Sequence, residues 1–459
     1  MAAEAPGRRF LAPAAWVNGA WAHDVLLAAD PAGRWSEVVP AASAQSRQGA
    51  QRLAGPVLPG LVNGHSHAFQ RAIAGLTERS TGGQDDFWRW RDRMYSVANR
   101  ITPGQLEAVA AFLYAELLRA GYTQVCEFQY LHNDPQGRPY ADPAEMSLAL
   151  LRAARRVGIG LTLLPTLYMR SGFGAPGLRE EQRRFASTPE SVLRVAQAVR
   201  RDAAGDGLVT AGLAIHSLRA VDEPALRQLA GAAVPGMPLH IHVAEQLQEV
   251  DDCIARHGLR PLEWLLEKLA PDARWNLVHA THCTPAELDG VRSSGACIVL
   301  CPSTEANLGD GVFDLPGWLG RGGRWAIGSD SHVTRSWQEE LRLLEYSQRL
   351  ALRQRNVAAR AALSESSAAA LFQGALEGGS AAAGLPLGGL APGQRADFVV
   401  IDPGSPALLG MPADHLLDAL VFSSPDARFS DVYVGGRPLA RDDTDLKAGF
   451  VRAMDSLWR

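Results

Sequence analysis

LVNGHSH, at residues 61–67, is a short apolar run that ends in two histidines, and the same plan recurs along the chain. Seven later runs are also short, apolar and rich in β-branched residues, and longer segments of helical period separate them. These runs are TQVCEFQYLH (123–132), GIGLTLLPTLYM (158–169), LVTAGLAIHSL (208–218), PLHIHVAE (238–245), WNLVHATH (275–282), CIVLCP (297–302) and WAIGSDSH (325–332). Eight strands, each followed by a helix, predict an α/β fold with a (β/α)8 TIM-type barrel. Active sites of such barrels lie at the carboxyl ends of the strands, where six of the eight runs carry polar residues.

The two ends of the chain differ from the barrel segment, which we expect to span residues 59–385. Residues 1–58 and 386–459 contain short strand-and-turn patterns, such as PGQRADFVVID (392–402) and DVYVGGRPLAR (431–441). We therefore expect one small β-sheet domain that is assembled from both termini.

Composition excludes several classes of protein. The chain has 459 residues, of which 47% are hydrophobic, so it can bury a sizeable core. A net charge of −4, with acids and bases mixed along the chain, favours neither nucleic acid nor membrane partners. We find no signal-like segment and no apolar run of membrane-spanning length, and the five cysteines are scattered. A cytoplasmic location is therefore expected.

Four strand ends carry residues that suit a metal centre. Alternate side chains of a strand share a face, so the pair His65 and His67 directs two imidazoles to one point, as zinc prefers. His242 can supply a third imidazole at the end of the fifth run, and Glu245 a carboxylate beside it. Asp330, at the end of the eighth run, can complete the ligand set and bind a reactive water. Structural histidines and a helix-capping aspartate are the alternative for each residue taken singly, but their joint placement favours the metal.

The sixth run and the lysine content refine this prediction. His279 lies where it can stabilise developing charge, so we assign catalytic roles to His279, Glu245 and Asp330. Only two lysines occur, and Lys268 and Lys447 lie in a helical segment and near the C-terminus. Neither can lie at a strand end, so a two-metal site bridged by a carboxylated lysine is excluded. One divalent ion, zinc before iron or manganese, is expected.

A second set of polar residues predicts an anionic substrate. Tyr130 ends the second run, His216 and Arg219 end the fourth, Gln70 follows the histidine pair, and Arg91 lies in a tryptophan-rich segment. Two arginines that face one cavity would hold carboxylates in bidentate fashion. Since 43 of the 45 basic residues are arginine, ordinary surface arginines are the alternative.

With these residues identified, the chain resembles the amidohydrolase superfamily, in its mononuclear deaminase branch. The similar segments are NGHSHAFQRAIAGLTE (63–78), WRWRDRMY (88–95), AIHSLRAV (214–221), HIHVAEQ (240–246), LVHATH (277–282), LCPSTEANLGDGVF (300–313) and GSDSHV (328–333). HAFQRAIAGLTE, WRWRDRMY and HSLRAV are the more specific ones, and they are similar to the superfamily's deiminases of N-formimidoyl-L-glutamate.

The resemblance implies hydrolysis of that small dicarboxylate to N-formyl-L-glutamate and ammonia, in histidine degradation, and a homodimeric assembly. It also implies a role for each residue named above. The implied metal ligands are His65, His67, His242 and Asp330, the implied catalytic residues are Glu245 and His279, and the implied substrate contacts are Gln70, Arg91, Tyr130, His216 and Arg219.

Three other interpretations stay open at this point. The first is a deaminase of a heteroaromatic base such as guanine or a pterin, which would need stacking surfaces rather than two carboxylate clamps. The second is a hydrolase that releases a different leaving group, such as chloride. The third is a non-catalytic barrel that serves as a scaffold.

Overall fold

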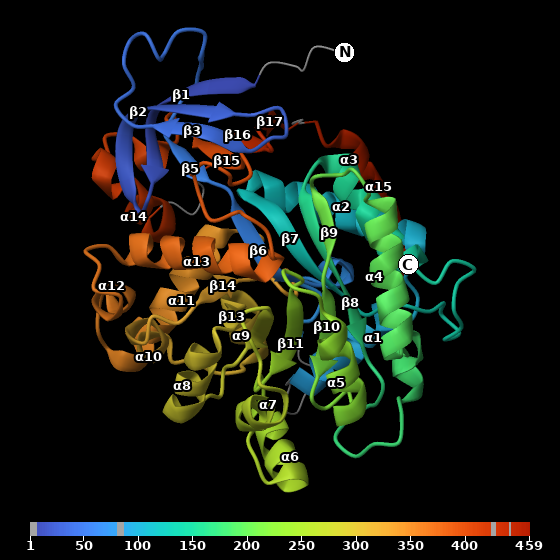
Figure 1. Ribbon diagram of the computed structural model, residues 1–459. Coiled ribbons are helices and arrows are strands. Elements are labelled where there is room, and N and C mark those ends of the chain that lie inside the picture. Colours follow the sequence, from blue (N-terminus) through green and yellow to red (C-terminus); the bar gives the residue numbers. More distant parts are fainter. Residues whose placement is uncertain (1–6, 80–86, 424–427, 440–441) are drawn as a thin grey trace.

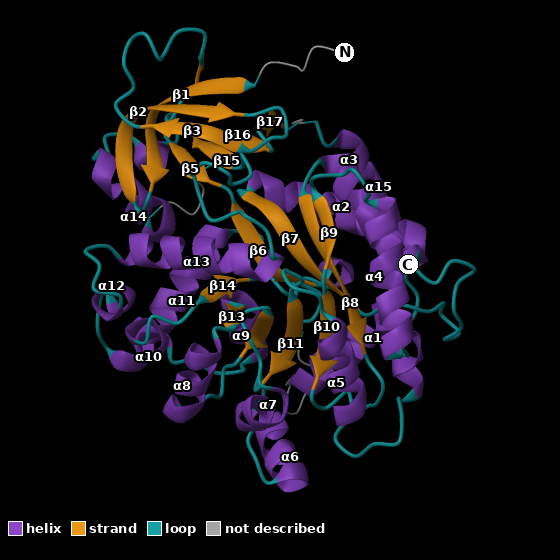
Figure 2. Ribbon diagram, viewed as in Figure 1, coloured by secondary structure: helices purple, strands orange, loops and turns teal. Residues whose placement is uncertain are grey.

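The computed structural model describes residues 7–79, 87–423, 428–439 and 442–459. Figure 1 shows two parts, a barrel surrounded by helices and a smaller sheet at one end of it. Figure 2 separates the strands of both parts from the purple helices that lie between and around them.

The barrel contains every strand that the eight apolar runs predict. Its hydrogen-bonded order is β14-β13-β12-β11-β10-β8-β7-β6, all pairs are parallel, and a short strand β9 (Val209–Ala211) pairs with β8. A parallel bridge between Ser66 and Asp330 brings the last strand beside the first, so the sheet nearly closes on itself. The eight strands are β6 (Leu61–Ser66), β7 (Tyr122–Gln129), β8 (Gly160–Leu167), β10 (Leu213–Ser217), β11 (Leu239–Val243), β12 (Trp275–His279), β13 (Cys297–Leu300) and β14 (Trp325–Ile327).

Helices follow the strands and cover the outside of the barrel. In the described residues they are α1 (Phe87–Ala98), α2 (Pro103–Arg119), α3 (Glu145–Val157), α4 (Pro189–Asp202), α5 (Glu223–Ala232), α6 (Leu247–His257), α7 (Pro261–Leu269), α8 (Pro285–Ser294), α9 (Pro302–Leu308), α10 (Leu315–Gly320), α11 (Trp337–Leu352), α12 (Val357–Ala361) and α13 (Ser367–Ala383). Short 3-10 turns η1 (Ala68–Ala72) and η2 (Glu180–Phe185) lie in the loops after β6 and β8.

Local sequence explains where such helices begin. At the start of α2, the Thr102 hydroxyl accepts from the Gln105 backbone N–H, the Gln105 side chain accepts from the Thr102 N–H, and Pro103 stands at the first helical position. This capping box satisfies backbone donors that the helix cannot pair itself. Helix α13 lies against strands β6 and β14, and its Ala382 carbonyl accepts from His240 Nε2 at 2.9 Å. The His240 side chain therefore contacts this helix.

The small sheet is built from both ends of the chain, as predicted. Its order is β17-β16-β15-β5-β1-β2-β3, with β4 beside β1. It has its own core, in which the rings of Phe398 and Tyr433 stack at a centroid distance of 4.2 Å and Phe10 packs edge-on against them. The strands are β1 (Arg8–Val17), β2 (Ala20–Ala29), β3 (Trp35–Val39), β4 (Gln51–Arg52), β5 (Val57–Pro59), β15 (Phe398–Ile401), β16 (Phe429–Val434) and β17 (Arg437–Pro438).

Some features of this region are absent from the sequence prediction. The segment GPVLPG (55–60) contains strand β5, which pairs with β15 and β1. The C-terminal segment includes η3 (Pro406–Leu408), η4 (Ala413–His415) and two helices, α14 (Leu416–Phe422) and α15 (Thr444–Trp458). The Trp458 indole of α15 donates to the Ala72 carbonyl in the barrel segment, so α15 does not lie within the small sheet. The domain boundaries at residues 58/59 and 385/386 stay a prediction.

The small sheet lies away from the carboxyl ends of the barrel strands. Strand β5 ends two residues before β6 begins, so the sheet lies at the amino ends of the barrel strands. The carboxyl ends lie on the far side. The five cysteines form no disulfide, and none of the described helices has the length and apolar character to cross a membrane.

Candidate active site

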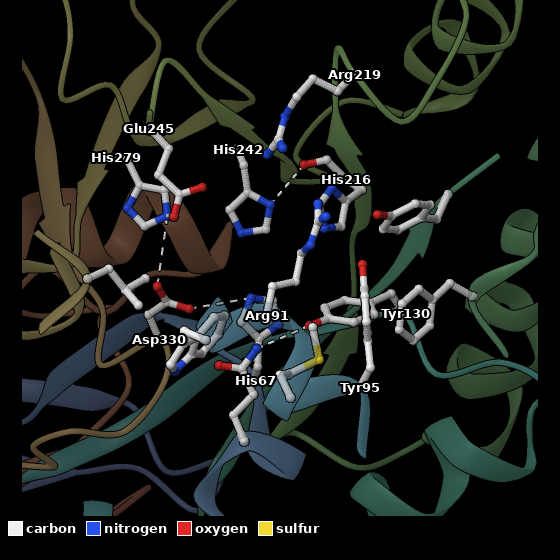
Figure 3. A pocket seen from close by; sticks show the side chains of 16 residues that line it. His67, Arg91, Tyr95, Tyr130, His216, Arg219, His242, Glu245, His279 and Asp330 are labelled. Carbon is white, nitrogen blue, oxygen red and sulfur yellow. Dashed lines mark hydrogen bonds and ion pairs between the residues drawn. The ribbon is translucent and has the colours of Figure 1, made fainter. Parts of the chain in front are cut away.

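A pocket opens at the carboxyl ends of the barrel strands, and it gathers almost the whole predicted site (Figure 3). Ten of the eleven predicted residues line it, and the eleventh, His65, is fully buried and contacts His67 and His242. Those ten are His67, Gln70, Arg91, Tyr130, His216, Arg219, His242, Glu245, His279 and Asp330. The barrel thus brings together side chains that are spread over more than 260 positions of the chain.

His65, His67 and His242, here called the imidazole cluster, converge on one point. The Nε2 atom of His65 lies 3.1 Å from that of His67 and 3.0 Å from that of His242. Asp330 Oδ1 lies 3.5 Å from His65 Nε2 and 3.4 Å from His67 Nε2. Ligand atoms placed tetrahedrally at about 2.1 Å from a zinc ion are separated by about 3.4 Å. The observed separations are therefore those of a ligand set around one ion.

Hydrogen bonds fix which nitrogen atoms of the cluster carry a lone pair. His67 Nδ1 donates to the Phe128 carbonyl at 2.9 Å, and His242 Nδ1 donates to the His216 carbonyl at 2.8 Å. Because a carbonyl oxygen can only accept, both Nδ1 atoms are protonated, and both neutral rings direct an Nε2 lone pair to the centre. Lone pairs that face one another repel unless a cation lies between them. The donor set therefore fits a divalent metal ion.

The surroundings of the cluster also keep it uncharged. Burial lowers the pKa of His65 well below its ordinary value, and the neighbouring His67 lowers it further. Burial and the proximity of His65 lower the pKa of His242 in the same way. Metal binding requires neutral imidazole, so the site does not depend on losing protons near neutral pH.

The backbone at these strand ends is strained. His279 and Ala280 follow one another with φ of 70° and 51°, Asp330 has φ of 45°, and Ala244 has φ of 52°. Left-handed backbone costs about 1–2 kcal/mol for a residue with a Cβ atom. Such residues concentrate at functional sites, where the surrounding structure holds them in place. Here the turns direct Asp330 and His279 into the pocket.

Buried carboxylates that the sequence analysis did not single out support the cluster. Glu127 on β7 accepts from the Ser66 hydroxyl at 2.7 Å and from the Ala68 N–H at 2.6 Å, so it holds both sides of His67. Glu249 on α6 accepts from the N–H groups of Ala244 and Glu245. An acidic residue inside the apolar run TQVCEFQ is the signal that could have identified Glu127.

Glu245, His279 and Asp330 form a proton-handling group beside the cluster. His279 Nε2 lies 3.6 Å from Glu245 Oε1 and 3.8 Å from Asp330 Oδ2, and its Nδ1 lies 3.2 Å from Glu305 Oε1. Burial opposes a charge on His279, but Glu245, Glu305 and Asp330 outweigh it and raise the pKa of His279 to about 10. Burial raises the pKa of Glu245 against the opposing effect of His279 and Arg219. The group can therefore both hold and release a proton near neutral pH.

The other wall of the pocket is cationic and aromatic. Arg91 of α1 and Arg219 after β10 both face the cavity in Figure 3, and Arg219 is partly buried. Gln70 Nε2 donates to the Tyr130 hydroxyl at 3.1 Å. His216 packs against Tyr168 with a centroid distance of 4.2 Å. Guanidinium groups in such a pocket can form bidentate hydrogen bonds with a carboxylate.

Comparison with known proteins places this architecture in a family. The model of the amidohydrolase family matches residues 57–439, which covers most of the chain and every site residue named above. The chain belongs to the amidohydrolase family.

Individual amidohydrolases agree with this assignment. A formimidoylglutamate deiminase from Pseudomonas aeruginosa is 49% identical over 424 residues, which cover 92% of each chain. The crystal structure of an amidohydrolase from Brucella melitensis has a TM-score of 0.92 and 41% identity, and the match covers 98% of this chain and 100% of the other. An adenosine deaminase from Xanthomonas campestris, crystallised with zinc, has a TM-score of 0.80 at 22% identity over 98% of both chains, which shows the shared fold.

Six pocket residues of this amidohydrolase were not predicted. They are Trp90, Met94, Tyr95, Tyr168, Phe185 and Leu308. Tyr168 directly follows β8, and a polar residue just after a barrel strand was the signal that could have identified it. Tyr95 lies four residues after Arg91 on α1, and the same helical face carries both.

Proposed function

We propose that the protein hydrolyses N-formimidoyl-L-glutamate to N-formyl-L-glutamate and ammonia. The observation that carries this proposal is a single pocket with a cluster of neutral imidazoles at one end and Arg91 and Arg219 at the other. The formimidoyl group would lie against the imidazole cluster, and the two carboxylates would lie against the arginines. The formimidoylglutamate deiminase at 49% identity supports the same substrate.

We further propose one divalent ion, zinc, held by the imidazole cluster and Asp330. Bound there, it would supply Lewis acidity and lower the pKa of a water molecule to about 7. Lys268 lies on α7 and Lys447 on α15, away from the strand ends, so neither can bridge a second ion. A single ion is the interpretation that this lysine placement favours.

The chain's own residues would position the substrate and move protons. Arg91 and Arg219 would hold the carboxylates by charge-assisted hydrogen bonds. Gln70, Tyr130 and His216 line the same pocket and would contact the carbon chain of the substrate. This anchoring fixes the formimidoyl carbon for attack and offsets the entropy of bringing the groups together.

Glu245 would accept one proton of the attacking water and return it to the imino nitrogen as the C–O bond forms. His279, whose Nδ1 lies 3.2 Å from Glu305 Oε1, would stabilise the negative charge that develops on the attacking oxygen. Asp330 would take the remaining proton from the added hydroxyl and pass it to the same nitrogen, so that the C–N bond breaks, ammonia leaves and the C=O bond of the formyl group forms. Burial, which raises the pKa of Glu245, makes this carboxylate a better acceptor for the proton of the water.

This activity would place the protein in histidine degradation in the cytoplasm. We propose a small dicarboxylate as its partner, with neither nucleic acid nor membrane, and a homodimer as its assembly. The mixture of acidic and basic residues along the chain supports the absence of a nucleic-acid or membrane partner. The five free cysteines support a cytoplasmic location. Size-exclusion chromatography with light scattering tests whether the protein is a homodimer.

One experiment tests the substrate and the metal together. Ammonia release is measured with N-formimidoyl-L-glutamate, guanine, adenosine and a chlorotriazine (assayed for chloride), and metal content is determined on the same sample. We expect turnover of N-formimidoyl-L-glutamate alone, with one zinc per chain. Turnover of guanine or adenosine instead would favour a deaminase of heteroaromatic bases. A protein that binds no metal and turns over none of these compounds would favour a non-catalytic scaffold.

A further inference from the structure

Two pocket tyrosines are joined by one buried glutamine. Gln182, on η2, has no exposed surface, and its Nε2 lies 3.1 Å from the Tyr95 hydroxyl and 2.9 Å from the Tyr168 hydroxyl. Tyr95 comes from α1, Tyr168 follows β8, and both line the pocket. Three separate segments therefore meet at this one side chain.

The direction of these hydrogen bonds is determined. The Arg179 backbone N–H donates to Gln182 Oε1 at 3.1 Å, which identifies the other terminal atom of Gln182 as the nitrogen. That nitrogen carries two protons and accepts none, so it donates one proton to each tyrosine oxygen. Each hydroxyl must then direct its own proton elsewhere. Among the residues that the structure describes, no acceptor for either proton is recorded.

The pocket is where these two protons can point. The guanidinium of Arg91 lies over the Tyr95 ring, with its carbon 5.7 Å from the ring centroid. Arg91 and Arg219 both act electrostatically on Tyr168, and burial, the largest effect, raises the pKa of Tyr168 so that its hydroxyl stays protonated. Two neutral donors thus lie beside two cationic groups, with Gln182 supplying no acceptor. An anion completes such an arrangement.

The tyrosines also lie at a distance from the reactive end. Ring contacts of Tyr168 reach Tyr130, Phe185 and His216, and the ring contacts of Tyr95 reach Phe185, but neither tyrosine has a ring contact with the imidazole cluster in the described residues. In N-formimidoyl-L-glutamate the side-chain carboxylate is two bonds farther from the formimidoyl carbon than the α-carboxylate. The remote carboxylate is therefore the one that these hydroxyls can reach.

We propose that Tyr95 and Tyr168 donate hydrogen bonds to the side-chain carboxylate of the substrate, and that Gln182 is the positioning residue that directs both hydroxyl protons into the pocket. This inference rests on the proposed function and adds the group that selects a dicarboxylate. The arginines supply charge, and the tyrosines supply the geometry that distinguishes a carboxylate from an uncharged amide.

The test compares two substrates that differ in one group. Wild type, Tyr95→Phe, Tyr168→Phe and the double variant are assayed with N-formimidoyl-L-glutamate and N-formimidoyl-L-glutamine. A hydrogen bond to a charged group contributes more than one to a neutral group, so we expect KM for the glutamate substrate to rise about 10- to 100-fold in the double variant. We expect kcat to change little and the glutamine substrate to be affected far less. Tyr346→Phe, on the exposed side of α11, is the matched control and should leave both substrates unchanged.

Gln182→Glu tests the positioning role. A carboxylate at this position would accept both hydroxyl protons and turn them away from the pocket, so KM for the glutamate substrate should rise although both tyrosines remain. The melting temperature of each variant checks that it is folded, and the tyrosine variants keep the test valid if Gln182→Glu is not. An unchanged ratio of kcat/KM between the two substrates in the double variant overturns the proposal.

Glutarate binding, measured by calorimetry on the same proteins, separates this inference from the proposed function. If wild type does not turn over N-formimidoyl-L-glutamate, the proposed function fails by itself. Weaker glutarate binding by the double variant than by wild type then still supports the tyrosine pair. Equal binding, or no binding by wild type, overturns it.

Discussion

The contact between the first and last barrel strands makes a sharp prediction about Gly328. A Cβ atom at this position would lie 2.6 Å from the Cβ of His65, 2.8 Å from its backbone nitrogen and 2.9 Å from its carbonyl oxygen. Ordinary contacts begin at 3.4 Å, so Gly328→Ala must separate β14 from β6 by about 0.8 Å. The atoms that have to move belong to the backbone at His65, and no flexible side chain can relieve the overlap.

The expected effect on stability follows from two opposing contributions. Overpacking of this kind lowers the free energy of unfolding by about 1–3 kcal/mol. The reduced freedom of the unfolded chain offsets about 0.4–1 kcal/mol of this loss. We therefore expect a net loss of about 1–2 kcal/mol in the metal-free protein. Because His65 shifts relative to Asp330, zinc affinity should fall by about 10- to 100-fold as well.

Denaturant unfolding of the metal-free protein measures the first quantity, and competition with a chelating dye measures the second. Gly104→Ala, in α2, is the matched control, since nothing lies within 4 Å of its added Cβ. It should leave zinc affinity unchanged and raise helix stability by up to about 1 kcal/mol. Wild-type zinc affinity and stability in Gly328→Ala would refute the reasoning.

Four further predictions concern chemistry, substrate binding, pH and metal. Glu245→Gln removes the proton acceptor, so kcat should fall by about 10²- to 10⁴-fold with metal content unchanged; a kcat close to wild type would exclude Glu245 from the reaction. Arg219→Met should raise KM for N-formimidoyl-L-glutamate by about 10- to 100-fold, whereas Arg227→Met, which removes an exposed partner of Glu223, should not; equal KM values in the two variants would contradict the anchoring role. Burial raises the pKa of Glu340 from 4.5 to about 8, so the folded protein binds this proton more strongly than the unfolded chain, and stability should fall as pH rises through this range. The free energy of unfolding of Glu340→Gln should accordingly rise relative to that of wild type between about pH 5 and about pH 8.5. Free energies of unfolding that change with pH in the same way in both proteins would contradict this prediction. Chelation should lower the melting temperature and added zinc restore it, because an ion at about 100 times its Kd stabilises the folded state by about 2.7 kcal/mol; an unaffected melting temperature would mean that no ion is bound.

The sequence predicted the barrel well because the signals for its strands are local. Each strand is marked by a short apolar run, and the alternation of side chains along β6 places His65 and His67 on the same face without knowledge of any other segment. Once a barrel is assumed, the ends of its strands must meet, so His242 and Asp330 could be assigned to the same centre from their positions in their runs.

The sequence was less informative where a residue acts through a partner from a distant segment. Glu127 stabilises the histidine pair from the neighbouring strand, and Gln182 connects Tyr95 with Tyr168 from a 3-10 turn. Glutamate and glutamine are also common on protein surfaces, so residue type alone does not distinguish these two. Only their burial and their partners distinguish them.

The sequence by itself determined the order of strands and helices, the identity of the residues at the strand ends and the absence of a bridging lysine. These follow from side-chain periodicity and composition, which are properties of neighbouring residues. Only the tertiary structure decided which nitrogen atoms of the imidazoles face the centre, how the proton on His279 is held and which way the tyrosine hydroxyls point. Those features depend on hydrogen bonds, burial and charge from segments far apart in the chain, and these exist only when the barrel has closed.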